Sequence, residues 1–320
     1  MQAATIVGGG DNNALTFSEV PTPTCGATDV LIAVAAAGVN RADLLQIKGL
    51  YPPPADAPTW PGLEVSGEIV AVGDAVTRWR VGQKVCALLP GGGYAQFAVV
   101  HQGLVLPIPA GVSLVNAAGL VEAACTVWSA LDAAQANPGQ SLLVHGGAGG
   151  IGSLAVQYAV ARGFTVLATA GSPERVQACR TLGATHAFDY TDPNWPDAVI
   201  AAGGADIVLD VMGASYLERN LQVLRIGGTL AIIGLQGGKK APLDLGALLS
   251  KRTRIVGLTL RSRPLEERVR IVSGVAADVW PLVPAKVRPV IAGTFPLAQA
   301  GRALDTLEAG GVIGKLVLIP

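Results

Sequence analysis

The sequence predicts an α/β protein with two domains, one rich in β-strands and one built on a parallel β-sheet. The chain has 320 residues, about twice the length of an ordinary single domain. Short β-like runs separated by Pro, Gly and Asp occupy its first part, whereas strands alternate with helical stretches in its middle part. The remaining C-terminal stretch is too short to form a further domain of normal size.

The first part, from Met1 to about Val121, is expected to form a compact β-rich unit. Its β-like runs cover residues 31–35, 65–72, 84–88 and 94–100. A helical turn is predicted at residues 40–44. The following Tyr51–Pro54 cannot continue a helix and is expected to run extended.

The middle part has the pattern of a doubly wound parallel sheet. Strands are predicted at 141–145, 165–169, 205–212, 228–234 and 254–260, and helices at 151–161, 173–182 and 214–224. Nearly continuous apolar strands of this kind are typical of a parallel sheet that helices cover on both faces.

The C-terminal pieces are a helix at 265–279, a β-like run at 287–292, a helix at 298–309 and a strand at 315–319. They are most economically placed in the N-terminal unit. The predicted domains are therefore 1–122 together with 264–320, and an inserted α/β domain at 123–263.

Composition and charge argue against several classes of protein. Hydrophobic residues make up 50% of the chain and charged residues 14%, and 23 Lys+Arg balance 23 Asp+Glu. Disorder and a basic nucleic-acid surface are therefore not expected. The N-terminus lacks the pattern of a signal peptide, and no run reaches the ~18 uninterrupted apolar residues that span a bilayer. A cytoplasmic protein without a membrane partner is expected.

A glycine-rich turn, Gly146–Gly152, lies between a predicted strand and a predicted helix. Gly147, Gly149 and Gly152 have the spacing GxGxxG. In this context the bare backbone lets a pyrophosphate approach, and the free N–H groups of a helix N-terminus favour the anion. The turn is therefore predicted to bind a dinucleotide.

The residues after the next strand favour NADP(H). NAD-selective folds place a carboxylate at this strand end, but here Gly171 and Ser172 follow it. Ser172 could donate to a phosphate, and Arg175 could neutralise it. Glu174 complicates this interpretation, and Arg175 could instead be a solvated residue of the next helix.

Catalytic zinc is not expected. The four cysteines, Cys25, Cys86, Cys125 and Cys179, are far apart and are interpreted as buried free thiols, and the histidines are only His101, His145 and His186. Gly62–Leu63–Glu64 also lacks a metal ligand between its glycine and its glutamate.

Several runs of the chain resemble the zinc-free quinone oxidoreductases of the medium-chain dehydrogenase/reductase superfamily, in particular the p53-inducible quinone oxidoreductase branch. The matching runs cover nearly the whole length: Asn40–Leu44, Gly49–Tyr51, Gly62–Glu64, Leu88–Gly93, Thr169–Ser172, Leu260–Arg263 and Ile313–Lys315. This resemblance implies a discontinuous GroES-like catalytic domain, a Rossmann domain between its two parts, and NADPH in the cleft.

The resemblance also assigns roles to individual residues. It implies contacts of Arg175 and Tyr190 with the 2′-phosphate, and places Thr126 and Asn40 near the nicotinamide. The predicted cofactor-binding set is completed by Gly147, Gly149, Gly150, Ile151, Gly152, Ser172, Gly234, Leu235, Arg261 and Lys315. It further implies a homodimer formed through residues 254–260, with tetramer formation left open.

A quinone accepts hydride without a Lewis acid, so the protein mainly has to position the reactants and stabilise negative charge on the quinone oxygen. Asn40 and Tyr51 are the candidate catalytic residues, Tyr51 also as a proton relay. Alternatively, Tyr51 packs on its own proline run and Asn40 caps the turn that follows it. Asp43 is expected to fix the loop, and Arg261 and Arg263 could bind phosphate or pair with carboxylates.

The leading function is thus NADPH-dependent quinone reduction. An alternative is reduction of the carbon–carbon double bond of an enone or enoyl thioester, which uses the same fold and cofactor but needs a proton donor at the α carbon. A remote alternative is a non-catalytic role as a lens crystallin or an RNA-binding protein, against which the balanced charge weighs.

Overall fold

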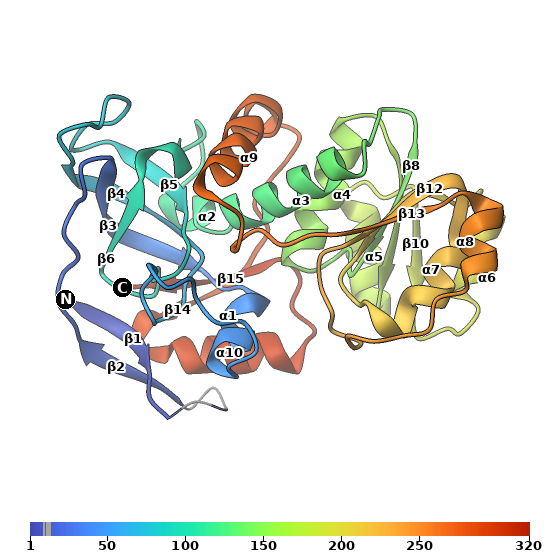
Figure 1. Ribbon diagram of the computed structural model, residues 1–320, viewed down its shortest axis with the longest axis horizontal. Helices are drawn as coiled ribbons and strands as arrows, with labels where there is room; N and C mark the ends of the chain where they lie inside the picture. Colours follow the sequence, from blue (N-terminus) through green and yellow to red (C-terminus); the bar gives the residue numbers. More distant parts are fainter. Residues whose placement is uncertain (9, 11–13) are drawn as a thin grey trace. The chain divides into compact units, whose positions relative to one another are not determined.

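The computed structural model describes residues 1–8, 10 and 14–320, and the chain divides into two compact units (Figure 1). The first unit comprises Met1–Cys125, Arg261–Pro284 and Pro289–Pro320, and the second comprises Thr126–Leu260 and Ala285–Arg288. The first unit thus contains both ends of the chain. The short segment 285–288 differs from the sequence-based boundaries, which placed it in the first unit.

The first unit is built on a seven-stranded sheet in the order β14-β15-β3-β4-β5-β7, with β6 paired to β3. Only β14 and β15 pair in parallel; the other pairs are antiparallel. The strands are β3 (Asp29–Gly38), β4 (Glu64–Val72), β5 (Lys84–Leu88), β6 (Phe97–His101), β7 (Val105–Pro107), β14 (Ile291–Pro296) and β15 (Lys315–Ile319). Separately, β1 (Gln2–Ile6) and β2 (Leu15–Glu19) form an antiparallel pair.

Strand β3 shows why this sheet forms. Val30, Ile32, Val34 and Ala36 alternate along it and are all buried, which is the period of a strand with one face on the core. Its last residue, Gly38, pairs with Val317 of β15. A Cβ at Gly38 would overlap the Glu64 carboxylate and the carbonyl of Ala118, so a residue without a side chain is required where β3, β4 and β15 come together.

The helices of the first unit connect and cover these strands. They are α1 (Arg41–Ile47), α2 (Leu114–Ala117), α9 (Leu265–Asp278) and α10 (Ala300–Ala309), with the 3₁₀ turns η2 (Gln102–Leu104), η4 (Trp280–Leu282) and η5 (Leu297–Gln299). Helix α3 (Val121–Ala133) begins in this unit and continues in the second. The indole Nε1 of Trp280 donates to the carbonyl of Pro107 at 2.8 Å, which ties the end of α9 to β7.

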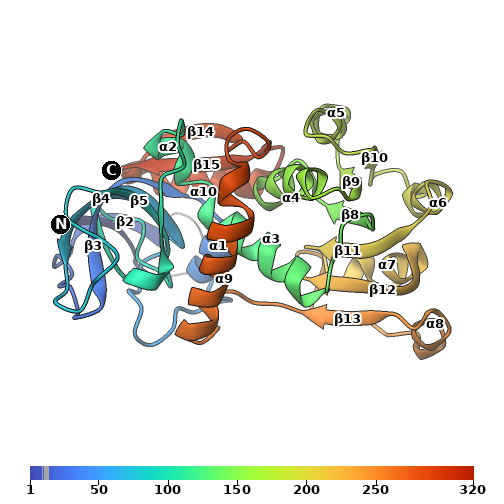
Figure 2. The same cartoon turned by 90° about the horizontal axis from the view of Figure 1, so that it is seen from above.

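The second unit is a six-stranded, fully parallel sheet in the order β10-β9-β8-β11-β12-β13. The strands are β8 (Ser141–His145), β9 (Thr165–Ala170), β10 (His186–Asp189), β11 (Ala205–Asp210), β12 (Leu224–Ile232) and β13 (Arg254–Gly257). The helices are α4 (Gly150–Ala161), α5 (Pro173–Thr181), α6 (Trp195–Ala201), α7 (Leu217–Val223) and α8 (Leu245–Lys251), with the 3₁₀ turn η3 (Ala214–Tyr216). Figure 2 shows α3 and α4 on one face of this sheet and α6 and α7 on the other.

The core of the second unit explains why its strands are continuous apolar runs. Leu143, Leu167, Val208 and Leu230 come from four strands and are fully buried. Trp195 at the start of α6 packs into the same cluster. Because helices cover both faces of the sheet, nearly every residue of the central strands β8, β9 and β11 is buried, and the alternation seen in β3 is lost there.

One predicted strand is shifted along the chain. The sequence predicted a β-run at 287–292, whereas β14 covers Ile291–Pro296. The backbone N–H and carbonyl of Arg288 are instead bound by the Gln157 side chain, at 2.9 and 3.0 Å. Pro289 has no N–H to offer to a ladder. These residues therefore cannot pair as a strand, and β14 begins only after them.

The stretch Leu114–Ala133 is long and apolar enough to cross a membrane by length and composition. Within it, 72% of the most apolar window is buried inside the protein. Core helices of globular proteins pass the same test.

Candidate functional site

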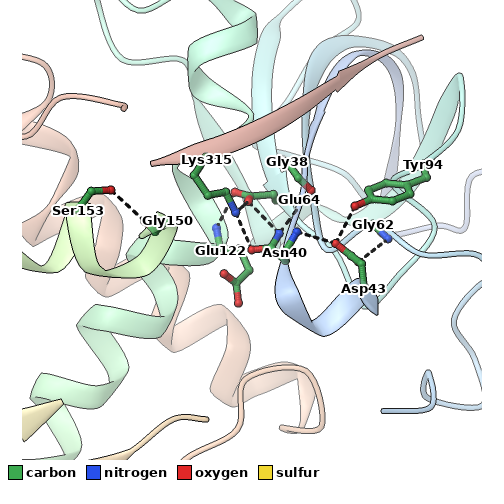
Figure 3. A network of polar contacts seen from close by, with 10 residues as sticks. All are labelled: Gly38, Asn40, Asp43, Gly62, Glu64, Tyr94, Glu122, Gly150, Ser153 and Lys315. Carbon is green, nitrogen blue, oxygen red and sulfur yellow. Dashed lines mark hydrogen bonds and ion pairs between the residues drawn. The ribbon is translucent and has the colours of Figure 1, made fainter. Parts of the chain in front are cut away.

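A buried ion pair stands at the centre of the polar network in the first unit (Figure 3). The Nζ of Lys315 lies 2.6 Å from Oε1 of Glu64, with 5% and 0% of the two side chains exposed. The same Nζ donates to Oδ1 of Asn40 at 2.6 Å, and Nδ2 of Asn40 donates to Oε1 of Glu64 at 3.0 Å. Lys315, predicted to bind the cofactor, is therefore engaged within the protein.

The second oxygen of Glu64 fixes the beginning of helix α3. Its Oε2 accepts the backbone N–H of Glu122 at 3.0 Å. A carboxylate at a helix N-terminus satisfies a free N–H and interacts favourably with the helix dipole. Glu64 thus ties β4, β15 and α3 to one point, next to Asn40.

Asp43 holds the turn that carries Asn40. Its Oδ2 accepts the backbone N–H of Asn40 at 2.8 Å and the hydroxyl of Tyr94 at 2.9 Å, and its Oδ1 accepts the N–H of Gly62 at 3.0 Å. Burial raises the pKa of Asp43 to about 6, although these hydrogen bonds and the charge of Lys315 act in the opposite direction. The position of Asp43 agrees with the expected role of fixing the loop.

Asn40 itself precedes helix α1 and is 6% exposed. Its backbone N–H is bound by Asp43, while its side chain reaches Lys315 and Glu64, with a longer contact of 3.4 Å to the carbonyl of Gly38. The side chain is thus held in one orientation by charged partners from two other strands.

Tyr51 lies apart from this network and next to Arg261. The Arg261 guanidinium carbon is 5.3 Å from the centre of the Tyr51 ring, and Nη1 donates to the Tyr51 carbonyl at 3.3 Å. Burial raises the pKa of the Tyr51 hydroxyl, which the charge of Arg261 partly counteracts. Arg263, by contrast, pairs with Glu267 at 3.2 Å.

In the second unit the glycine-rich turn leaves no room for side chains at two of its glycines. A Cβ at Gly147 would lie 2.8 Å from Cβ of Ala168, and a Cβ at Gly152 would lie 2.7 Å from Cα of Gly147. Gly149 is the N-cap of α4, and Gly150, Ile151 and Gly152 form its first turn. The glycines thus allow close packing of helix on strand and leave the helix N-terminus bare.

The residues after β9 present hydrogen-bond donors. Ser172 caps helix α5 by accepting the N–H of Arg175 at 3.3 Å. The Nε of Arg175 is buried and has no hydrogen-bond partner within the described residues. Tyr190 covers Gly171, where a Cβ would overlap the Tyr190 hydroxyl. Ser172, Arg175 and Tyr190 therefore belong to one corner of the sheet, as a phosphate site needs.

Glu174 lies in the first turn of α5. Its own backbone N–H and the Ser172 hydroxyl lower its pKa, so Glu174 is ionised at neutral pH. It therefore adds a negative charge beside the candidate phosphate site.

Three other candidate cofactor residues also lie in the second unit. Thr126 is half-buried in α3. Gly234 follows β12, and a Cβ there would lie 2.8 Å from the carbonyl of Val211. Leu235 is 51% exposed.

The residue types that commonly bind metals are scattered in the described part of the chain. In the part of the chain that the structure describes, no three His, Cys, Asp or Glu side chains come together as ligands. His145 is buried between Thr169 and Asn220, at 2.9 and 2.7 Å, and burial lowers its pKa to about 4. Cys86, Cys125 and Cys179 are buried free thiols, whereas Cys25 is half-buried.

Sequence reasoning missed the central role of Glu64 and the part of Tyr94. A usable signal was present, because Glu64 and Lys315 each begin an otherwise largely apolar strand. A charge at such a position must be paired when it is buried.

Three models of known families match parts of this chain. The alcohol dehydrogenase GroES-like domain matches residues 26–110, and the zinc-binding dehydrogenase model matches residues 150–273. A third model, of the YspA, cpYpsA-related SLOG family, matches residues 115–174. The first match falls on the β-rich unit, and the second falls mainly on the parallel sheet.

Curated relatives cover nearly the whole chain. Quinone oxidoreductase of Rattus norvegicus is 33% identical over 312 residues, which are 94% of this chain and 92% of the relative. The Homo sapiens quinone oxidoreductase is 30% identical with the same coverage.

Solved structures agree. The quinone oxidoreductase of Thermus thermophilus is 34% identical with a TM-score of 0.86, and that of Escherichia coli in complex with NADPH is 25% identical with a TM-score of 0.89. Both comparisons cover 100% of each chain. The predicted GroES-like and Rossmann folds are confirmed, and the chain belongs to the quinone oxidoreductases of the medium-chain dehydrogenase/reductase superfamily.

Proposed function

We propose that this protein is an NADPH-dependent quinone oxidoreductase that acts without zinc. The observation that carries the proposal is the end of β9, where Ser172 and Arg175 are hydrogen-bonded and Tyr190 covers the adjacent Gly171. Arg175 has a buried Nε without a partner among the described residues, and no carboxylate stands directly at the end of β9 to bind a ribose hydroxyl. Names and bound cofactors of the relatives support the same conclusion.

The residues of the second unit fit this cofactor. The N–H groups in the first turn of α4, where Gly150 and Gly152 carry no side chain, would hold the pyrophosphate. Ser172, Arg175 and Tyr190 would hold the 2′-phosphate, while Thr126, Ile151, Gly234 and Leu235 are the remaining proposed contacts in this unit. When bound, NADPH supplies the hydride that a quinone accepts.

The residues of the first unit would act on the acceptor. Transfer of a hydride leaves negative charge on a quinone oxygen, and preorganised donors stabilise such charge. Asn40 is held by Lys315, Glu64 and Asp43. One N–H of its amide donates to Glu64, so Asn40 would stabilise the charge through its second N–H, which makes only a longer contact of 3.4 Å to the carbonyl of Gly38. The Tyr51 hydroxyl would deliver the proton that completes the hydroquinone.

The role of Lys315 in this proposal is indirect. Its Nζ is bound by Glu64 and Asn40, and its charge favours the orientation in which Nδ2 of Asn40 points away from it. We therefore assign Lys315 to positioning Asn40 and leave phosphate neutralisation to Arg175.

Subunit pairing is the remaining part of the proposal. Strand β13 is the edge of the parallel sheet, and Leu245 and Leu249 of the preceding α8 are 68% and 81% exposed. A second copy pairing along β13 would satisfy the open edge. We propose a homodimer of this kind, located in the cytoplasm.

The reaction class is tested by a panel of acceptors. Anaerobic NADPH oxidation would be followed with an ortho-quinone, a para-quinone, an enone and an enoyl thioester, and the products would be identified. Hydroquinone formation is expected. A saturated product from the enone or thioester, with no turnover of quinones, would replace the proposal by alkene reduction.

A further inference from the structure

Arg261 is a buried cation whose hydrogen-bonding capacity is incompletely used. The residue is 5% exposed. The Nε donates to the carbonyl of Pro90 at 2.7 Å and Nη1 to that of Tyr51 at 3.3 Å. The Nη2 is buried and has no hydrogen-bond partner in the described chain.

The surroundings of this guanidinium supply no ion-pair partner. Among the described residues no carboxylate lies within ion-pair distance of Arg261, and its other contact is the face of the Tyr51 ring. A buried charge with an unfilled donor is unfavourable unless an acceptor arrives from elsewhere. A purely structural residue at this position would gain by being uncharged.

Gly91 lies beside Nη2 of Arg261, where the missing hydrogen-bond acceptor would be placed. Gly91 has φ +156°, and a Cβ built on it would stand 3.2 Å from Nη2 of Arg261 and 3.2 Å from the carbonyl of Pro58. Any side chain at this position would therefore approach the free donor. Because Gly91 is a glycine, no side chain occupies the space next to Nη2 on that side.

The contacts of Arg261 all belong to the first unit. Pro90, Gly91, Tyr51 and Pro58 are in this unit, whereas the candidate phosphate contacts Ser172 and Arg175 are in the second. The missing hydrogen-bond partner of Arg261 is therefore better assigned to an oxygen of the quinone substrate than to a phosphate of the cofactor. Tyr51, the candidate proton donor, is the residue that Arg261 holds.

We propose that Nη2 of Arg261 binds a carbonyl oxygen of the quinone and stabilises the negative charge that forms there, while its Nη1 and planar face hold Tyr51 in place. This inference rests on the proposed function. In the overall reaction, quinone, NADPH and one proton give hydroquinone and NADP⁺. Arg261 stays protonated throughout, and the proton on the product comes from Tyr51, which solvent reprotonates.

The test compares Arg261→Gln, Arg261→Lys and Gly91→Ala with the unaltered protein. Arg263→Gln is the matched control, since Arg263 lies two residues away and is paired with Glu267. Steady-state rates with an ortho-quinone give kcat and the KM of each substrate. Circular dichroism and thermal unfolding establish that each variant is folded.

For Arg261→Gln we expect kcat/KM for the quinone to fall about 10²-fold, the usual effect of removing one charge-stabilising donor. The KM for NADPH should stay within about twofold of the unaltered value, because no cofactor contact is lost. Arg261→Lys should recover only part of the loss, since an ammonium cannot reach both carbonyls and the substrate. Gly91→Ala should raise the KM for the quinone, and Arg263→Gln should change neither constant.

Chemical rescue separates binding of substrate from support of the loop. In Arg261→Ala, millimolar guanidinium should restore part of the quinone activity, and it should not accelerate the unaltered protein. A raised KM for NADPH with unchanged quinone kinetics would overturn the proposal in favour of phosphate binding. Unchanged kinetics in every variant would overturn the proposal. A loss of quinone activity that guanidinium does not restore would also overturn it, and would show that Arg261 only supports the loop. Absence of quinone turnover in the unaltered protein would overturn the proposed function, and this inference with it.

Discussion

The Nζ of Lys315 lies 2.6 Å from Oε1 of Glu64, and neither side chain is appreciably exposed. The pair joins the last strand of the chain to β4 and, through Glu64, to the start of α3. Removing one partner of a buried ion pair leaves an uncompensated charge. This contact therefore couples the candidate site to the stability of the whole β-rich unit.

Lys315→Met should lower the free energy of unfolding by about 3–5 kcal/mol, the usual cost of leaving one member of a buried pair alone. Urea denaturation of the variant and of the unaltered protein measures this change in unfolding free energy. The double variant Lys315→Met with Glu64→Gln should recover part of the loss because the stranded charge is gone. A Lys315→Met protein as stable as the unaltered one would show that the pair contributes nothing.

Arg175→Ala should weaken NADPH selectively. Hydrogen bonds to charged groups contribute about 1.5–3 kcal/mol, so the KM for NADPH should rise about 10- to 150-fold, while that for NADH should change less than about twofold. Arg180→Ala, in the last turn of the same helix, is the control. An equal loss for both cofactors would place Arg175 outside the phosphate site.

Glu174→Gln should have the opposite sign. Its backbone N–H and the Ser172 hydroxyl keep Glu174 ionised, and that charge repels a 2′-phosphate beside Ser172. Removing it should lower the KM for NADPH severalfold and leave the KM for NADH unchanged. Steady-state kinetics with both cofactors decide the matter, and an improved KM for NADH alone would contradict this arrangement.

Asp43 should give stability a specific dependence on pH. Burial raises its pKa to about 6 from 3.8, so between these values the folded protein binds more protons than the unfolded chain. Stability contributed by this group is therefore present at acid pH and is lost as the pH rises from about 4 to 6, by about 3 kcal/mol.

Asp43→Asn isolates this effect. The difference in unfolding free energy between the variant and the unaltered protein should shift by about 3 kcal/mol across that range and stay constant above about pH 7. Denaturation at a series of pH values measures it. A difference that does not vary with pH would mean that Asp43 titrates alike in both states.

The parallel sheet was largely predictable, because its signals are local. Strand β8 begins and ends where the sequence predicts, and α4 begins one residue earlier. Apolar runs bounded by glycine turns need no knowledge of distant residues. Strand β14 of the other unit was misplaced because the side chain of Gln157, 131 residues away, engages Arg288.

The candidate site was predictable only in part. The glycine turn and the Ser172 corner are short segments whose spacing carries their chemistry. Glu64 meets Lys315 only after β3, β4 and β15 have paired, so its role depends on contacts far apart in the chain. The sequence left open whether Asn40 is a cap or a catalytic group. In the structure it is the N-cap of α1, and its amide also binds Lys315 and Glu64.

Some sequence-based statements stay predictions. They include the individual cofactor contacts, zinc-independence and the cytoplasmic location, and also the narrower resemblance to the p53-inducible branch, the catalytic roles of Asn40 and Tyr51, and the homodimer through residues 254–260. The last two have direct readouts: Tyr51→Phe should lower kcat for quinones with NADPH affinity intact, and the mass in solution reports the dimer.

The most direct test of the central claim is the stoichiometry of one anaerobic reaction. Purified protein, a limiting amount of an ortho-quinone and excess NADPH would be incubated, and hydroquinone and NADP⁺ would both be quantified. We predict one NADP⁺ formed for each hydroquinone, with NADH oxidised far more slowly. NADPH left unoxidised, or oxidised only when an enone or enoyl thioester replaces the quinone, would contradict the account.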